Sequence, residues 1–284
     1  MKLFNKILFF TSCIMMGFTQ AKDIIFDLGY TLVKPDTMAL SSEIGMADFI
    51  SYSLFDGKNQ DDLKVAVFDI LSLISGNQTG DESLFVCADN GEPFPQILVD
   101  WQCGLVDPQE VYEVALVYAR ELKALGYFTS SQEYRLVCNA LRIMLDPELL
   151  ASHMKPIKKG IKLLKECAEQ INKDGTPAHR LFILSNWDPT SFEFLKKTDV
   201  FQELLQYVQP EHIVISGDIQ KIKPHRDIYD YTLKRFKIKP QECIFIDDQE
   251  SNIFGAQQCG INAIHLEHKK YKELRENLHK LNVV

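Results

Sequence analysis

Short apolar runs alternate with segments of helical spacing from residue 155 onward. The runs, which are typical of strands buried on both faces, are Leu181–Leu184, Ile213–Ile215, Cys243–Ile246 and Asn262–Leu266. The segments between them carry apolar residues three and four positions apart, and we predict helices over Ile157–Ile171, Arg226–Phe236, Ile253–Gln258 and Lys269–Lys280. Another apolar strand, Ile24–Phe26, lies near the start. This pattern predicts an α/β fold, a Rossmann-like parallel sheet with helices on both faces.

Residues 34–154 follow a different pattern. They contain no comparable strand run, and their apolar residues recur at helical spacing in Asp61–Ile74, Pro108–Leu125 and Ser131–Leu145. Stretches rich in Gly, Asn, Asp and Pro separate these segments, as turns do. We therefore predict an inserted all-helical domain over 34–154, between a strand and turn at 22–33 and the rest of the core domain at 155–284.

The first 21 residues have the pattern of a cleavable signal peptide. Lys2 and Lys6 precede an apolar run that ends at Phe18, and small residues lead to Ala21. The run is shorter than the roughly 20 apolar residues of a membrane-spanning helix. The alternative is a buried N-terminal element. We favour cleavage after Ala21 and expect an exported protein, periplasmic or secreted, that keeps no stable membrane anchor.

Composition and charge narrow the classes of function. The 284 residues are 46% hydrophobic and 25% charged, as in globular proteins of one large domain or two ordinary ones. The formal net charge of −8 and the lack of a long basic run argue against nucleic acid as a partner. No Cys and His spacing is typical of a zinc site. Cys87 and Cys103 could pair in an oxidising compartment, whereas Cys243 and Cys259 are expected to be free core residues.

Polar residues follow four of the predicted strands. These strand ends carry Asp27, Ser185-Asn186, Lys223 in the run from Ser216 to Pro224, and Asp247-Asp248. Because function in parallel sheets gathers at the carboxyl ends of the strands, we expect these side chains to meet. Their order, with a helical insertion after the first, resembles the haloacid dehalogenase superfamily, in the subfamily whose helical cap lies between the first two motifs.

The resemblance implies a phosphatase that acts on a small phosphorylated substrate. Asp27 would be the nucleophile and would form an aspartyl phosphate, which water then hydrolyses. Lys223 would offset the charges of Asp27 and the phosphate, Ser185 and Asn186 would bind the phosphoryl group, and Thr31 would orient the turn. Mg²⁺ would neutralise the repulsion between the two anions. Its ligands would be Asp27, the carbonyl of Gly29, Asp248 and, as a secondary ligand, Asp247.

Gly29 departs from the family pattern Asp-x-Asp-Gly-Thr. It stands where the second Asp protonates the leaving group and then activates water, and Tyr30 stands where the family has Gly. One interpretation is a phosphatase that favours good leaving groups, such as aryl or anomeric sugar phosphates. In a second, Tyr30 substitutes as a proton donor. A third is a catalytically weak binding scaffold, and a fourth is a metal-independent haloacid dehalogenase, against which the pair Asp247-Asp248 argues.

Four further residues are candidates for the substrate pocket. Trp101 and Phe94 lie in the predicted cap, where packing is the expected role for both. Trp187 and Asp188 follow the second motif and so lie nearer the predicted chemistry.

Overall fold

The computed structural model describes residues 22–76, 94–267 and 270–284. The predicted signal peptide at 1–21 and the predicted disulfide partner Cys87 lie outside these residues. Cys103 is buried. In the described part of the chain, no helix combines the length and the apolar character needed to cross a membrane.

A five-stranded parallel sheet forms the core. Its order is β5-β4-β1-β6-β7, and the strands are β1 (Lys22–Phe26), β4 (His179–Ser185), β5 (Ile213–Ile215), β6 (Cys243–Asp247) and β7 (Asn262–His265). The central strand β1 pairs with β4 and β6 on its two sides, and Phe26 lies beside Ile183 and Ile246. This register brings the carboxyl ends of the three central strands to one edge of the sheet. The predicted Rossmann-like fold class is confirmed.

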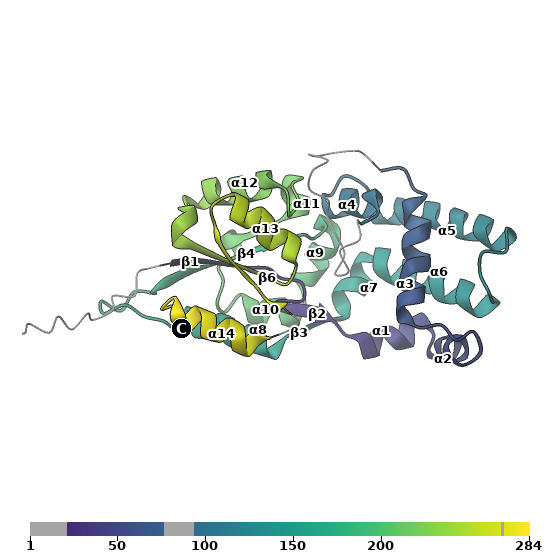
Figure 1. Cartoon of the computed structure of the whole chain (residues 1–284), viewed down its shortest axis with the longest axis horizontal. Helices are drawn as coiled ribbons and strands as arrows, with labels where there is room; N and C mark the ends of the chain where they lie inside the picture. The colour runs from purple at the N-terminus through teal and green to yellow at the C-terminus, as the bar shows by residue number, and fades with distance from the viewer. Residues whose placement is uncertain (1–21, 77–93, 268–269) are drawn as a thin grey trace, which may run out of the picture.

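Helices cover both faces of this sheet because alternate strand residues point to opposite sides. Ile24 and Phe26 pack in one buried cluster with side chains of α8 (Lys158–Ala168) and α14 (Tyr271–Lys280). Ile25 packs in a second cluster with α12 (Arg226–Phe236) and α13 (Glu250–Gln258). Figure 1 shows the two layers, with α12 and α13 above the sheet and α8 and α14 below it.

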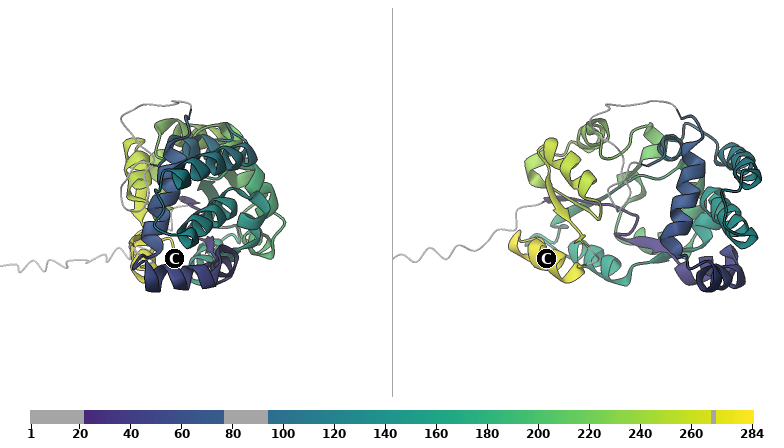
Figure 2. Two further views of the ribbon diagram at one scale, coloured as in Figure 1. Left: turned by 90° about the vertical axis from the view of Figure 1, so that its right-hand side faces the viewer. Right: turned by 45° about the vertical axis from the view of Figure 1, so that its right-hand side comes forward.

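The helical cap stands at the carboxyl end of the sheet and has an apolar core of its own. Figure 2 shows this arrangement from two further directions. The described helices of the cap are α1 (Thr37–Ile44), α2 (Met46–Phe55), α3 (Gln60–Ser72), α4 (Gln96–Gln102), α5 (Pro108–Ala124), α6 (Ser131–Leu145) and α7 (Pro147–Ser152). The three helices predicted from apolar spacing correspond to α3, α5 and α6, with ends that agree to within two residues.

Two short strands that sequence analysis missed connect the cap to the core. β2 (Val33–Pro35) and β3 (Met154–Pro156) pair antiparallel, with Lys34 opposite Lys155. Each has three residues, too few for an alternating pattern to be visible. The two segments in which the chain passes between core and cap are therefore hydrogen-bonded to each other as a two-stranded ribbon.

The remaining helices of the core are short. They are α9 (Pro189–Leu195), α10 (Asp199–Leu204), α11 (Ser216–Ile219) and two 3₁₀ turns, Pro210–His212 and Pro240–Glu242. One predicted helix is also shorter than expected: α8 ends at Ala168, because Ile171 leaves the helix to pair with Pro177 in an isolated antiparallel bridge. Ile171 is exposed and lies in the turn that leads into β4.

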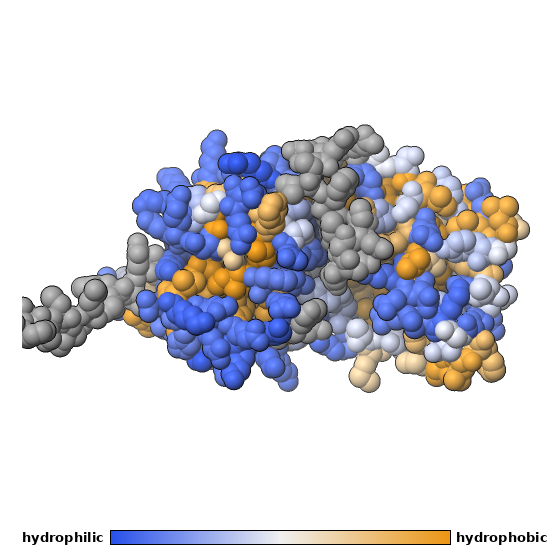
Figure 3. Space-filling model, in the orientation of Figure 1, coloured by the Kyte–Doolittle hydropathy of each residue, from blue (hydrophilic) through white to orange (hydrophobic). Residues whose placement is uncertain are grey.

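The far end of the cap carries an apolar patch. Met46, Ile50 and Leu54 recur every four residues on α2 and are exposed, as is the neighbouring Phe55, whereas Tyr52 on the same helix is fully buried. Figure 3 shows this patch over α2, away from the carboxyl edge of the sheet.

Candidate active site

Five of the predicted residues meet at the carboxyl edge of the sheet: Asp27, Ser185, Lys223, Asp247 and Asp248. The Lys223 ammonium lies at their centre and is 1% exposed. Its Nζ donates to Asp27 Oδ1 at 2.6 Å and to Asp247 Oδ2 at 2.7 Å. Ser185 Oγ donates to the same Asp27 oxygen at 3.2 Å. Strand ends from β1, β4 and β6 thus supply a charge-assisted network that the order of motifs alone could only suggest.

The charges of this network shift each other's pKa. Burial raises the pKa of Asp27 well above its usual range, and the nearby charge of Asp247 adds to this, although Lys223 opposes it. Burial alone would lower the pKa of Lys223, but the charges of Asp247 and Asp27 outweigh it and raise the pKa to about 12. The lysine is therefore a fixed positive charge that opposes the rise in the pKa of Asp27.

Asn186 holds the backbone of Lys223. Its Oδ1 accepts from the Lys223 backbone N–H at 2.9 Å, and its Nδ2 donates to the Lys223 carbonyl at 2.9 Å. Both polar atoms of the side chain are used in this way, although the residue also lines the neighbouring cavity. The predicted contact of Asn186 with substrate stays a prediction, whereas its positioning of Lys223 is a role that sequence reasoning missed.

The three carboxylates fit a hard divalent cation. Asp27, Asp247 and Asp248 each offer an oxygen, and these oxygens lie within 4.8 Å of one another. Asp247 is already engaged, since Oδ1 accepts from the Gln249 backbone and from Asn252 Nδ2, and Oδ2 accepts from Lys223. Oxygen ligands at this spacing suit Mg²⁺. Asp27 and the half-buried Asp248 would hold the ion most directly, and Asp247 would support it.

The turn after Asp27 is tight. The Thr31 backbone N–H donates to the Gly29 carbonyl at 2.6 Å, and a carbonyl oxygen can still accept from or ligate a second partner. No heavy atom of the described residues lies within 4 Å of the place where a Cβ of Gly29 would be. Tyr30 follows with a φ of 53° and is 46% exposed. The turn therefore has room for the side chain that the family pattern would place at Gly29.

Thr31 is fixed through its backbone. Its carbonyl accepts from the Tyr271 hydroxyl at 2.9 Å and lies where a Cβ of Gly160 would come within 2.2 Å. Its own hydroxyl is buried and has no hydrogen-bond partner among the described residues. Sequence reasoning assigned the orientation of the turn to Thr31 alone. It missed Tyr271 and Gly160, which lie 240 and 129 positions after Thr31 in the sequence.

A cavity of about 390 Å³ lies against these residues, between the core and the cap. Asp27, Gly29, Ser185, Lys223 and Asp248 line its catalytic end. The four further candidates for the pocket, Phe94, Trp101, Trp187 and Asp188, all lie on its wall.

All four of these wall residues also pack or cap, and Trp187 belongs to the buried cluster of the core. Trp101 belongs to the buried cluster of the cap, and Phe94 packs against that cluster, as expected from the sequence. Asp188 accepts from the Ser191 backbone at 2.8 Å and so caps α9.

The arrangement was compared with known proteins. The family model of haloacid dehalogenase-like hydrolases matches residues 123–266. A glyceraldehyde 3-phosphate phosphatase from Pyrococcus furiosus is 38% identical over 65 residues, which are 22% of this chain and 27% of that protein. The chain thus aligns with about a quarter of the length of this curated relative.

Solved structures share the fold. An enzyme of the haloacid dehalogenase family from Bacteroides thetaiotaomicron, in a magnesium complex, superposes with a TM-score of 0.51 at 16% identity, over 90% of this chain and 98% of that one. A phosphatase of the same family from Thermococcus onnurineus gives 0.50 at 16% identity, over 90% and 97%. A dehalogenase with an intermediate complex also gives 0.50, at 13% identity, over 88% and 86%. With the family match and the strand-end residues, these findings show that the chain belongs to the haloacid dehalogenase-like hydrolase family.

Proposed function

We propose that this hydrolase is a magnesium-dependent phosphatase that cleaves a small phosphate ester through an aspartyl phosphate on Asp27. The observation that supports it most is the buried Asp27 carboxylate, hydrogen-bonded to Lys223 and Ser185 and clustered with two further carboxylates. A paired carboxylate cluster is unnecessary for metal-independent dehalogenation, and its presence favours phosphoryl transfer.

The chemistry follows from the positions of these groups. An oxygen of Asp27 attacks phosphorus and the bond from phosphorus to the ester oxygen breaks. The leaving group departs as an oxyanion with the electron pair of that bond and takes up a proton from water. The Lys223 ammonium and the Ser185 hydroxyl, which both donate to Asp27, hold the carboxylate and bind the phosphoryl oxygens. Water then hydrolyses the aspartyl phosphate and releases inorganic phosphate. When bound, Mg²⁺ supplies positive charge that offsets the repulsion between carboxylate and phosphate.

The glycine at position 29 restricts which leaving groups can depart from the phosphate ester. The family's second aspartate would protonate the departing oxygen, and a positioned acid typically contributes about 10²- to 10⁴-fold in rate. Asp188 also lines the cavity, but the Ser191 backbone and hydroxyl both donate to its carboxylate, so it is engaged in capping α9. We therefore propose that the enzyme favours alcohols that depart as stable anions, without protonation.

A turnover assay tests this proposal. With Mg²⁺, the purified protein should hydrolyse an aryl phosphate, and Asp27→Asn should abolish this, whereas Asp199→Asn, which changes an exposed aspartate at the start of α10, should not. Removal of Mg²⁺ with a chelator should stop turnover, and adding it back should restore it. A well-folded protein that leaves a panel of phosphate esters intact would favour the binding scaffold. Halide release from a 2-haloacid without metal would favour dehalogenation.

We also propose that the enzyme is exported and begins at Lys22 in its mature form. Support comes from the signal-like pattern of residues 1–21, and cleavage after Ala21 would keep every described strand of the sheet. Determination of the N-terminal sequence of protein recovered from outside the cytoplasm tests this. Recovery of the uncleaved chain from the cytoplasm would contradict it.

A further inference from the structure

We infer, resting on the proposed phosphatase activity, that the cavity selects aryl phosphates, the phosphate esters of phenols, over phosphates of sugars and polyols. The inference depends on the chemistry of the cavity wall opposite the catalytic residues, on the way that wall is fixed, and on the leaving group that Gly29 requires.

The cap wall of the cavity is apolar. Its apolar side chains come from α3, α4, α6, α7 and β3 and from the segment before α4: Phe68, Phe94, Leu98, Trp101, Met144, Leu150 and Met154. The polar cap residues described on this wall are Lys64 and Gln102. A sugar or polyol bound here would bury several hydroxyl groups against carbon, and each buried hydroxyl without a partner costs free energy. The wall therefore disfavours a polar alcohol.

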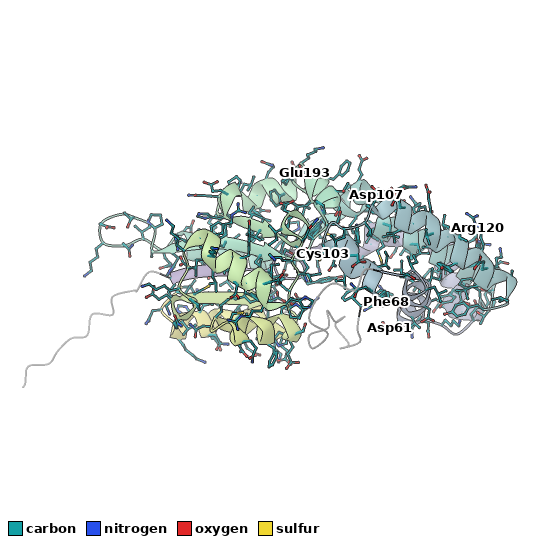
Figure 4. The ribbon with its side chains drawn as sticks, turned by 90° about the horizontal axis from the view of Figure 1, so that it is seen from above. Asp61, Phe68, Cys103, Asp107, Arg120 and Glu193 are labelled. Carbon is teal, nitrogen blue, oxygen red and sulfur yellow. The ribbon has the colours of Figure 1, made fainter. Side chains whose placement is uncertain are left out.

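Aromatic rings form the part of the wall best suited to a flat ligand. Phe68 and Phe94 lie with their ring centroids 5.6 Å apart and their planes tilted by 43°. Both are half-buried, so their faces are not fully used by packing within the cap. Phe68 lies on the side of the cap turned toward the core, as Figure 4 shows. A substrate ring can add to this pair in a tilted or offset arrangement, which aromatic pairs prefer.

The wall is attached to the core. Ser216 Oγ donates to the Gln102 carbonyl at the end of α4 at 2.6 Å and accepts from the Trp187 backbone at 2.9 Å. Gly217 packs closely beside them, since a Cβ there would lie 2.4 Å from Pro189 Cδ. Figure 4 shows Cys103, the residue after α4, where the cap meets the core. The α4 part of the apolar wall is thus held against the core.

Size and leaving group agree with this ligand class. A volume of about 390 Å³ is at the lower end of the roughly 300–1,000 Å³ of small-molecule sites. It suits one phosphate with one or two rings. Without an acid at position 29, a phenol leaves more easily than an alkyl alcohol because its anion is more stable. Sequence alone left aryl and anomeric sugar phosphates open, and the apolar wall favours the aryl class.

Binding of non-hydrolysable phosphonates tests the inference without requiring turnover. In the presence of Mg²⁺, we expect benzylphosphonate to bind the purified protein roughly 10- to 100-fold more tightly than 2,3-dihydroxypropylphosphonate, the range expected for burial of a ring. Phe68→Ser should reduce this ratio several-fold. The matched control is Val65→Ser on the same helix, because Val65 is 54% exposed and is not on the cavity wall. If Phe68→Ser fails to fold, Met144→Gln tests the same wall from α6.

The outcomes separate this inference from the proposed activity. Equal binding of the two phosphonates, tighter binding of the dihydroxypropyl compound, or no binding of either overturns the inference. Asp27-dependent hydrolysis of esters would stand in each of these cases. A clear preference for benzylphosphonate that Phe68→Ser reduces and Val65→Ser preserves supports the inference, even if no ester is hydrolysed. In that last case the proposed phosphatase activity fails while the ligand class stands.

Discussion

Gly29 is the residue on which the chemistry depends most. It lies two positions after the candidate nucleophile, faces the cavity, and has open space where a side chain would project. The sequence could predict its importance because the neighbouring residues match a pattern that Gly29 breaks. It could not predict whether the turn had closed over the missing side chain, because the turn is held by residues far along the chain, among them Tyr271 and Gly160.

We expect Gly29→Asp to raise turnover of alkyl phosphates. The new carboxylate can protonate the leaving oxygen, which is worth about 10²- to 10⁴-fold for a positioned acid. Turnover of aryl phosphates should change much less, because phenols leave without protonation. Steady-state kcat/KM for an alkyl and an aryl ester, measured on both proteins, checks this. A drop for both esters would mean that the turn has adapted to Gly29 and no longer positions an acid.

The imidazole of His179 connects the start of β1 to the last residues of the chain through hydrogen bonds. Its Nδ1 lies 3.3 Å from the Lys22 backbone nitrogen at the start of β1, and its Nε2 lies 3.1 Å from the Val283 carbonyl at the end of the chain. With Nε2 donating and Nδ1 accepting, the neutral ring satisfies both partners. Burial, the largest cause, lowers the pKa of this imidazole below its ordinary value of 6.5.

This shift predicts a loss of stability in acid. Because the unfolded chain binds the proton more readily than the folded one, stability is complete above pH 6.5 and falls as the pH drops below it. Protonation would also break the hydrogen bond from Lys22. We expect the free energy of unfolding to fall less steeply between pH 7 and pH 5 for His179→Gln than for the wild-type protein. Denaturant unfolding at several pH values measures this, and parallel curves for the two proteins would contradict it.

At the scale of elements, apolar pattern predicted most of what is buried. β1, β4 and β6 are central strands covered on both faces, so each contains a continuous run of apolar side chains. The helices α3, α5 and α6 of the cap are long enough for their apolar spacing to be visible. Some short elements were not predicted, among them β2, β3 and α4 with three to seven residues. The equally short β5 was predicted because its three residues are all apolar. The structure of β2, β3 and α4 depends on contacts with residues that are distant in the sequence.

Gly160 shows how one helix supports the catalytic turn. It lies in the first turn of α8, and a Cβ at this position would come within 2.2 Å of the Thr31 carbonyl. We expect Gly160→Ala to destabilise the protein by about 1–3 kcal/mol, as overpacking of a close contact does, and to lower kcat by displacing the turn after Asp27. Thermal unfolding and turnover of an aryl phosphate measure the two effects.

The matched control for Gly160→Ala is Lys159→Ala, which changes an exposed residue of the same helix. It should leave both stability and kcat close to wild type. Equal behaviour of the two variants would show that α8 does not position the turn.

At the scale of the whole molecule, α7 of the cap packs against α9 of the core, and two further contacts among the described residues join the cap to the core. One is the β2–β3 ribbon, through which the chain passes twice. The other is the contact of α4 with α9 and α11, in which Ser216 bonds the Gln102 carbonyl and the Trp187 backbone. The catalytic edge was predictable from sequence because parallel strands align their carboxyl ends. The second attachment was not, because a strand-end serine carries no signal of a partner 114 positions away.

Removal of the Ser216 hydroxyl should loosen the second attachment alone. Ser216→Ala leaves the Gln102 carbonyl and the Trp187 N–H without their partner, which costs about 1–3 kcal/mol for a buried group. Because the β2–β3 ribbon and the packing of α7 on α9 remain, we expect the cap to stay folded while α4 separates from the core more often. Amide hydrogen exchange should therefore speed up in α4 and stay unchanged in α12.

KM for an aryl phosphate should rise more than kcat falls, since α4 carries part of the apolar wall and none of the catalytic groups. Ser72→Ala is the control, because this exposed hydroxyl bonds only the Phe68 carbonyl of its own helix. Faster exchange throughout the cap would instead mean that the contact of α4 with the core holds the whole cap together.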